Sequence, residues 1–199
     1  MRFMSLIFVI VASVVYCQEI PSKESQIAAA VMAAPHQFRD GATVLGYDAK
    51  GTLTSLRHGS NNMICLADDP NKKGFSVASY HMDLEPFMAR GRQLRSEGKS
   101  FEEVFNIRET EAKNGKLKMP EKGATLHVLY GPNGKYKPQT DEVINATYRY
   151  VVYIPWATTE TTGLPIVPST AGGPWIMDPG THRAHIMINP PAENIKEDN

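Results

Sequence analysis

The hydrophobic pattern of the chain begins with an apolar run from Phe3 to Tyr16 that only two serines interrupt. Arg2 precedes this run, and the chain becomes polar at Gln18. A positive start, a short apolar run and a polar exit are typical of a secretory signal peptide. The run is also too short for a permanent transmembrane span, which needs about 20 apolar residues. We therefore predict that residues 1–17 are a signal peptide and that the protein is periplasmic or secreted.

The end of the apolar run is compatible with two kinds of processing of the N-terminus. Val15 and Cys17 are small residues at the two positions that a signal peptidase reads, which favours cleavage after Cys17. The alternative is a lipid anchor on Cys17, but lipoproteins normally carry a small residue where this chain has Tyr16. Cleavage leaves Cys65 as the one remaining cysteine, so an intramolecular disulfide is not expected.

The first half of the remaining chain predicts one helix and several strands. Residues 18–40 are interpreted as an N-terminal helix or a tether, with Ser22 as the helix N-cap and Pro35 as its stop. Short β-prone segments separated by polar turns follow, and they predict an antiparallel meander. The four segments are Ala42–Tyr47, Thr52–Arg57, Asn62–Ala67 and Phe75–His81.

The middle of the chain changes to a helical period. Asp83 can cap a helix that runs to about Glu97, and Ser100 with Glu103 forms the pattern of a capping box for a second helix. The stripe on one side of the second helix consists of Phe101, Val104, Phe105 and Arg108.

The last third returns to strands, at 124–130, 146–154 and 184–188. Between them lies a long segment rich in Pro, Gly and Thr, residues 155–181, and loops of this length are often functional. The predicted class is therefore α+β: a mostly antiparallel sheet with a central pair of helices and this long loop. We expect one domain at 41–190 and a polar C-terminal tail at 191–199.

Composition narrows the range of functions. The chain carries 21 Lys and Arg against 21 Asp and Glu, so its formal net charge is zero. A neutral balance argues against nucleic acid as a partner and against electrostatic binding to a membrane. The sequence has no phosphate-binding glycine loop, no paired CxxC motif and no nucleophile elbow of the hydrolase type. No cofactor is predicted.

The long loop and the strand after it hold the candidate ligand-binding residues. Trp156 and Trp175 stand near the two ends of the loop, and each offers a large apolar face with one polar group. They can line a ligand pocket or fix the loop to the domain, and the second role is the commoner one. The candidate set is completed by Met177, His182 and His185, which follow closely.

A second set of residues keeps a metal-based alternative open. His185 and Met187 share one face of a predicted strand, and imidazole with thioether is a ligand pair for copper. His81 and His182 are further candidate ligands. Cys65 lies between apolar neighbours, which is typical of an inert buried thiol rather than a nucleophile. Simple packing of these side chains is the more common explanation.

Several segments carry a resemblance. The segments 173–177, 180–181 and 184–188, together with 81–88, resemble small exported bacterial proteins that have no assigned activity. The resemblance extends over most of the chain after the leader. It implies a bacterial source and a periplasmic or extracellular location, and it implies no catalytic residue.

Three hypotheses follow from these observations. The favoured one is an exported, non-enzymatic domain that binds a small or extended ligand through the 155–181 loop and the beginning of the last strand. The alternative is a metal-dependent enzyme or a copper-handling periplasmic protein that uses His81, His182, His185 and Met187. A structural or interaction module of the cell envelope is the third, with an envelope protein as partner.

Overall fold

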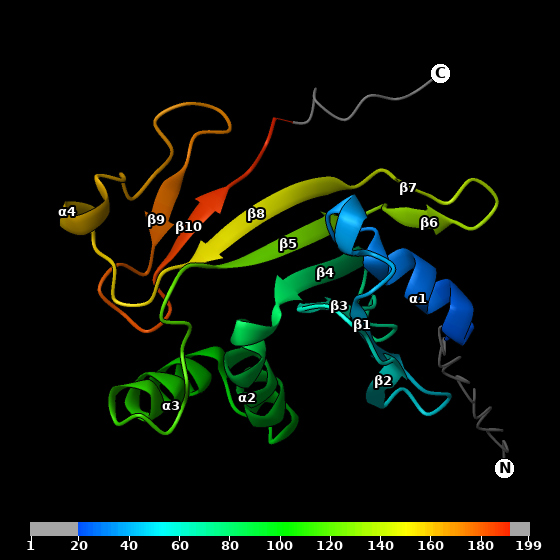
Figure 1. The fold of residues 1–199 in the computed structure, drawn as a ribbon, viewed down its shortest axis with the longest axis horizontal. Coiled ribbons are helices and arrows are strands. Elements are labelled where there is room, and N and C mark those ends of the chain that lie inside the picture. Colours follow the sequence, from blue (N-terminus) through cyan, green and yellow to red (C-terminus); the bar gives the residue numbers. More distant parts are fainter. Residues whose placement is uncertain (1–19, 192–199) are drawn as a thin grey trace, which may run out of the picture.

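An eight-stranded sheet with the strand order β2-β1-β3-β4-β5-β8-β10-β9 forms the centre of the protein (Figure 1). The computed structural model describes residues 20–191. All neighbouring strands are antiparallel except β1 and β3. The strands of this sheet are β1 (Thr43–Tyr47), β2 (Leu53–Arg57), β3 (Met63–Leu66), β4 (Phe75–His81), β5 (Ala124–Gly131), β8 (Thr147–Tyr153), β9 (Trp175–Met177) and β10 (His185–Ile188). A separate hairpin pairs β6 (Lys135–Lys137) with β7 (Glu142–Ile144).

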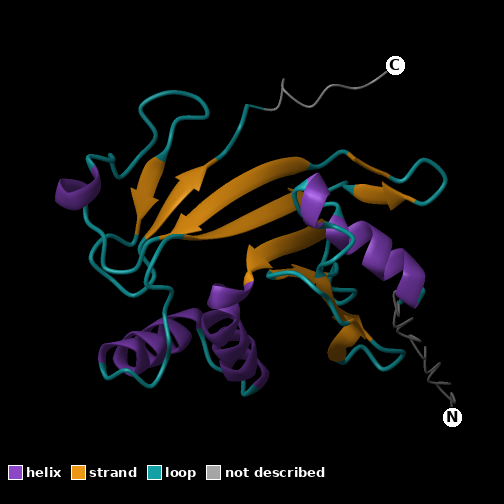
Figure 2. Cartoon of the chain, viewed as in Figure 1, coloured by secondary structure: helices purple, strands orange, loops and turns teal. Residues whose placement is uncertain are grey.

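Helices cover parts of both faces of the sheet (Figure 2). They are α1 (Lys23–Val31), α2 (Glu85–Ser96), α3 (Phe101–Lys113) and the single turn α4 (Thr159–Thr162). Alternate residues of β4 show that α1 and α2 lie on opposite faces, because side chains alternate along a strand. Val77 packs in the cluster of α1, whereas Tyr80 packs with Phe87 of α2. The sheet therefore has a separate apolar core on each side.

The predicted α+β class and the mostly antiparallel sheet are confirmed. Local capping signals were also informative. The Ser22 side chain accepts a hydrogen bond from the Ser25 N–H, and α1 begins at Lys23. Ser100 and Glu103 form the expected capping box at the start of α3. Each contact satisfies an N–H group that the first helical turn leaves free, so these helix starts could be predicted from a few neighbouring residues.

Three expectations about the fold need correction. The first four strands are not a simple meander, because β3 pairs with β1 in parallel and leaves β2 at the edge. The helix predicted from Asp83 begins at Glu85 instead, since the Asp83 N–H donates to His81 and residues 82–84 form a 3₁₀ turn. The long loop at 155–181 is not without structure, because it contains α4 and the edge strand β9.

Several sequence predictions fall on residues outside the described range. The signal peptide at 1–17, the processing of Cys17 and residues 192–199 of the predicted tail all lie there. Within residues 20–191, the helices are too short or too polar to pass through a bilayer. In the predicted 18–40 segment, Ala30 of α1 and Ala34 of the turn after it pack in one cluster with Val44 and Cys65.

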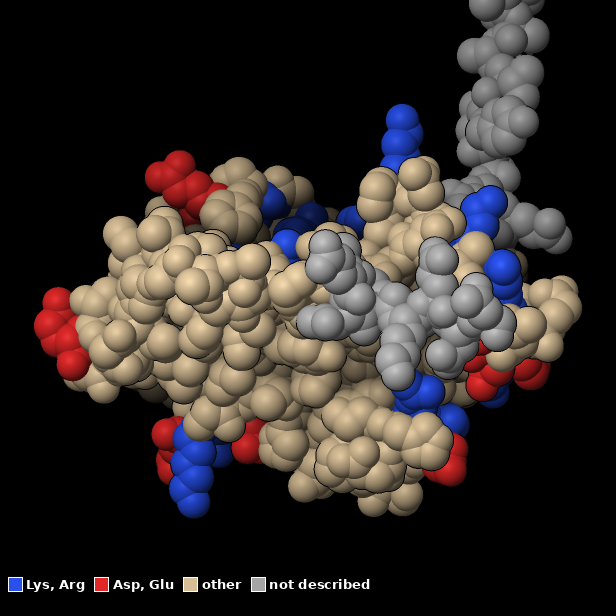
Figure 3. Space-filling view, turned by 90° about the horizontal axis from the view of Figure 1, so that it is seen from above, with Lys and Arg blue, Asp and Glu red and all other residues tan. Residues whose placement is uncertain are grey.

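Figure 3 shows the face of the molecule that lies uppermost in Figure 1. Seen from above relative to Figure 1, charged side chains lie mostly at the margins of the molecule, and uncharged residues cover much of the left half (Figure 3). The arginines of α2 and α3 belong to the other side of the sheet, where the helix pair lies in Figure 1.

Candidate functional site

A cavity of about 260 Å³ opens where α2 and α3 meet the end of the sheet. Its floor consists of four buried residues, Phe87, Val104, Arg108 and Tyr153. Met88 and Arg183 form its walls, and the exposed side chains of Arg95, Lys99 and Phe101 form its rim. Four of these nine residues are cations, and none is acidic. The cavity is therefore both apolar and positively charged.

The floor residues reach the cavity from three different elements. Phe87 belongs to α2, Val104 and Arg108 to α3, and Tyr153 is the last residue of β8. The Phe87 and Tyr153 rings lie against each other, with their centroids 5.3 Å apart. Val104 and Arg108 are four residues apart on one helix and so share a face. The apolar stripe predicted for this helix thus forms one side of the cavity.

Arg108 is the unusual member of the floor, because it is a cation with only 7% of its surface exposed. Its guanidinium carbon lies 3.8 Å from the centre of the Phe87 ring, and Nη1 donates to the Phe87 carbonyl at 3.2 Å. Nε is buried and has no hydrogen-bond partner. None of the ion pairs within residues 20–191 includes Arg108.

The electrostatic environment of Arg108 is unfavourable for its charge. Burial lowers the pKa of its guanidinium to about 10, and the positive charges of Arg183 and Arg95 act in the same direction. The group still carries its proton at neutral pH. A buried charge normally has an opposite charge beside it, because desolvation costs several kcal/mol. Arg108 therefore lacks the partner that its burial calls for.

Gly91 makes room for this guanidinium. A Cβ atom at position 91 would lie 2.8 Å from Nη1 of Arg108 and 3.5 Å from Nη1 of Arg95. The first distance reflects the close approach of α2 and α3, whereas Arg95 lies one turn further along α2 itself. A side chain at position 91 would therefore force Arg108 to move. A glycine in a helix interior costs about 1 kcal/mol relative to alanine. The close approach accounts for its presence.

The other three cations of the cavity differ in whether they have an acidic partner. Lys99 pairs with Glu103 at 3.1 Å, and Arg183 pairs with Asp178 at 3.4 Å. Arg95 has no ion-pair partner within residues 20–191, and burial followed by repulsion from Arg92 lowers its pKa. The cavity thus has two cations without a counter-charge, Arg108 at the floor and Arg95 at the rim.

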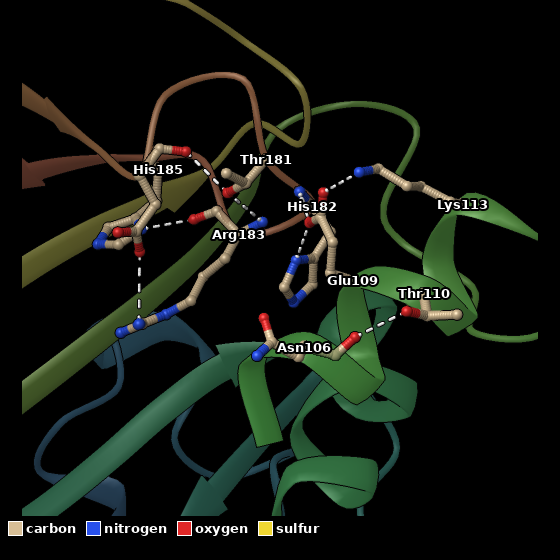
Figure 4. Close-up of polar contacts among 9 residues, drawn as sticks. Asn106, Glu109, Thr110, Lys113, Thr181, His182, Arg183 and His185 are labelled. Carbon is tan, nitrogen blue, oxygen red and sulfur yellow. Dashed lines mark hydrogen bonds and ion pairs between the residues drawn. The ribbon is translucent and has the colours of Figure 1, made fainter. Parts of the chain in front are cut away.

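A buried histidine and a glutamate support the cavity from behind (Figure 4). His182 has no exposed surface, and its Nδ1 lies 2.5 Å from Oε2 of Glu109. The backbone N–H of His182 donates to the same oxygen at 2.9 Å, and Lys113 pairs with the other oxygen at 2.7 Å. Figure 4 shows His182 and Glu109 pointing toward each other, while Arg183 extends away from them. The Glu109 carboxylate therefore ties the β9–β10 turn to α3.

The charges of this pair are set by burial and hydrogen bonds. Burial lowers the pKa of His182 more than the neighbouring carboxylate raises it, so the ring is neutral at pH 7. Desolvation would raise the pKa of Glu109, but hydrogen bonds from Lys113 and His182 outweigh it and lower this pKa to about 2. Because a carboxylate can only accept, the proton of the neutral ring is assigned to Nδ1. Nε2 is then a buried acceptor without a partner.

His185 extends a line of aromatic rings that begins with the floor residues Phe87 and Tyr153. Its Nδ1 lies 2.7 Å from the carbonyl oxygen of Arg183, and its ring centroid is 5.1 Å from that of Tyr153. His182 in turn lies between Phe87 and Phe105, with centroid distances of 5.8 and 5.0 Å. His182 and His185 thus meet in one aromatic cluster, but neither lines the cavity.

The remaining candidates from the sequence lie elsewhere in the fold. Trp156 is partly exposed, with the Lys113 ammonium 6.0 Å from its ring. Trp175 and Met177 are strand residues of β9 that pack against the main core. These three side chains are not part of the cavity lining.

The histidines proposed as metal ligands do not converge. His81 lies on β4, which β5 and β8 separate from β10, and its ring contacts Asp83. Met187 is buried in the core beneath the sheet. Within residues 20–191, no group of three or more His, Cys, Asp or Glu side chains is arranged to hold a metal ion.

Cys65 lies in the apolar core between α1 and the sheet, and it does not line the cavity. The residue is fully buried between the sheet and this helix, and burial raises the pKa of its thiol. Both properties disfavour the thiolate that a nucleophile needs.

Sequence analysis overlooked the cations of the cavity, although one signal was present. Arg108 occupies a position of the apolar stripe of α3, where the helical period calls for a hydrophobic residue. An arginine in such a position must be paired, buried at a cost or placed beside a ligand. The contributions of Arg95, Lys99 and Arg183 carry no comparable signal, because they depend on how three elements meet.

Comparisons with protein-family models, with curated proteins and with solved structures found no match to this chain.

The buried histidines predict a loss of stability in mild acid. Burial lowers the pKa values of His182 and His185. Below about pH 6.5, the histidines of the unfolded chain therefore bind protons more readily than the same histidines in the folded protein. Stability therefore falls as the pH drops below this value, by at most about 1.4 kcal/mol per pH unit for each ring. Denaturant unfolding at pH 7.5, 6.0 and 5.0 measures the slope.

The control for this prediction is His36→Gln, which changes an exposed histidine outside the cluster. This variant should keep the wild-type slope, whereas His182→Asn should reduce it. Equal stability of the wild-type protein at pH 5.0 and 7.5 would contradict the prediction.

Proposed function

We propose that the protein is an exported ligand-binding domain that holds a small anionic molecule in the cavity between α2, α3 and the end of the sheet. The observation that carries this proposal is the buried guanidinium of Arg108, which lines the cavity and has no counter-charge within residues 20–191. An anion in the cavity would supply the missing charge. Export is proposed from the leader in the sequence.

The surroundings of Arg108 support the same function. Arg95 at the rim is a second cation without a partner, so the field inside the cavity is positive and attracts anions. Gly91 keeps open the space that the Arg108 guanidinium occupies. Buried apolar side chains exclude water from the floor, and a charge pair is stronger where water is excluded.

This site differs in place from the one predicted from the sequence. The 155–181 loop contributes none of the cavity residues, and the beginning of the last strand contributes only Arg183. The pair of His182 and Glu109 is not proposed as a catalytic base, since the His182 side chain is fully buried behind the cavity. Binding is therefore favoured over catalysis.

The test measures the thermal unfolding of the protein with acetate, benzoate or inorganic phosphate, each against sodium chloride at the same ionic strength. At least one of the three anions should raise the unfolding temperature beyond the chloride value, because a ligand that binds only the folded state stabilises it. Arg108→Met should weaken that binding by about 100-fold or more, since it removes the buried partner charge.

Lys118→Gln is the matched control, because it removes one exposed positive charge outside the cavity. It should bind the anion as the wild type does. The proposal would be overturned if none of the three anions acts beyond chloride, or if Arg108→Met binds as tightly as Lys118→Gln.

A further inference from the structure

We infer that the cavity selects a small monocarboxylate with an apolar body, in preference to a phosphate. This inference rests on the proposed function and names the class of its ligand. It follows from four features of the cavity: the charge at its floor, the chemistry of its walls, the state of the nearest helix N-terminus and its volume.

The positive charge at the floor matches a ligand that carries one negative charge. Arg108 is the one unpaired cation among the buried floor residues, and Arg183 and Lys99 already have acidic partners. Arg95, the other unpaired cation, is exposed to solvent at the rim. A carboxylate would neutralise Arg108 and leave no excess charge in the apolar floor. A phosphate carries up to two charges, and its second charge would be desolvated against Phe87, Val104 and Tyr153 at a cost.

The shape of the cation also suits a carboxylate. Phe87 covers one face of the Arg108 guanidinium, and Nη1 is occupied by the Phe87 carbonyl. Nε is buried, so Nη2 and the second N–H of Nη1 are the donors that remain for a ligand. Planar guanidinium and carboxylate groups meet edge to edge through parallel hydrogen bonds, which lysine cannot reproduce.

The walls require an apolar body on the ligand. Phe101 at the rim is 72% exposed. The neighbouring floor is apolar apart from Arg108 and the Tyr153 hydroxyl. Arg183 lies over the Phe101 ring at 5.1 Å and can hold it beside the opening. A ligand with a ring or a branched chain would cover Phe101 and fill the space beside Met88, gaining the apolar contact that a bare anion cannot make.

The helix terminus at the cavity is not available to a phosphate. Phosphates commonly bind the free N–H groups at the start of a helix. At the start of α3, Ser100 accepts from the Glu103 N–H, and the Glu103 carboxylate accepts from the Ser100 N–H. This capping box also puts a negative charge at the very place where a phosphate would need donors.

The volume sets the size of the ligand. At about 260 Å³, the cavity is smaller than the roughly 300 Å³ at which pockets for drug-sized molecules begin. A ligand of the size of benzoate or a short branched fatty acid is expected.

The test compares ligands by titration calorimetry at constant ionic strength. Benzoate and 4-methylpentanoate represent the inferred class, acetate lacks the apolar body, benzamide lacks the charge, and phenyl phosphate carries the wrong anion. Benzoate should bind at least about 10-fold more tightly than acetate or phenyl phosphate, and about 100-fold more tightly than benzamide.

A rim variant tests the apolar contact separately. Phe101→Ser should weaken benzoate binding by about 5-fold and leave acetate unaffected, since only benzoate reaches the rim. Its matched control is Phe38→Ser, which changes an exposed phenylalanine far from the cavity lining. Because Phe101 is exposed, the variant is expected to fold.

The outcomes separate this inference from the proposed function. If phenyl phosphate binds more tightly than benzoate and Arg108→Met abolishes its binding, the carboxylate class is wrong and anion binding stands. Equal affinities of benzoate and acetate, or of benzoate and benzamide, would also overturn the inferred class. If none of these compounds binds and inorganic phosphate does not bind either, both the class and the proposed function are wrong.

Discussion

Replacing Arg108 by methionine is expected to raise the free energy of unfolding of the ligand-free protein by about 1–3 kcal/mol. The guanidinium is buried, has one hydrogen bond to the Phe87 carbonyl and lacks an acidic partner within residues 20–191. Methionine fills a similar volume without a charge to desolvate, and it keeps contact with the Phe87 ring. The Phe87 carbonyl lies inside α2, where the next helical turn supplies a hydrogen bond.

The measurement is denaturant unfolding of protein freed of bound anions by dialysis. The control is Arg90→Met, which removes an arginine of α2 that pairs with Glu111 at the surface, at 2.6 Å. Loss of this partly exposed pair should cost between zero and about 1 kcal/mol. A ligand-free Arg108→Met protein less stable than the wild type would show that the charge is already compensated, and the argument for an anion site would lose its basis.

Replacing Glu109 by alanine is expected to lower the free energy of unfolding by about 3 kcal/mol. The carboxylate accepts from the backbone N–H and the ring N–H of His182, and it pairs with Lys113. Alanine leaves two buried donors of His182 without partners, and each orphaned donor costs about 1–3 kcal/mol. The β9–β10 turn, which carries Arg183 into the cavity wall, loses its connection to α3.

Glu102→Ala is the matched control for this variant. Glu102 lies on the same helix, is exposed and has no ion pair within residues 20–191, so its replacement should change stability by less than about 0.5 kcal/mol. Glu109→Gln should fall between the two, since the amide oxygen can still accept one of the hydrogen bonds. A loss below 1 kcal/mol for Glu109→Ala would show that the turn is held by other contacts.

These two neighbouring residues of α3 thus have opposite expected effects. Glu109 supports the fold, whereas Arg108 weakens it and is explained by binding. Residues that cost stability are often found at functional sites, because a site must offer groups that the folded protein itself does not satisfy. The sign of the Arg108 effect is therefore as informative as the binding experiment.

Some of this site could be predicted from the sequence. The capping box at Ser100 and the stripe of Phe101, Val104 and Arg108 follow from residues three or four apart, which share one side of a helix. The His182 and His185 segment was also singled out, and its two rings do meet in one cluster with Tyr153 and Phe87. Trp156 and Trp175 do not line this cavity, so their role in ligand binding stays a prediction from the sequence.

By itself, the sequence determined several local elements: the starts of α1 and α3, most of the strands and an arginine in an apolar stripe. These depend on the helical and strand periods and on hydrogen bonds between near neighbours. The tertiary structure alone decided that β1 pairs with β3, that Glu109 meets His182 across 73 residues, and that four cations surround one cavity. Such contacts depend on how packed elements meet, and no local period encodes the distance between residues so far apart in the chain.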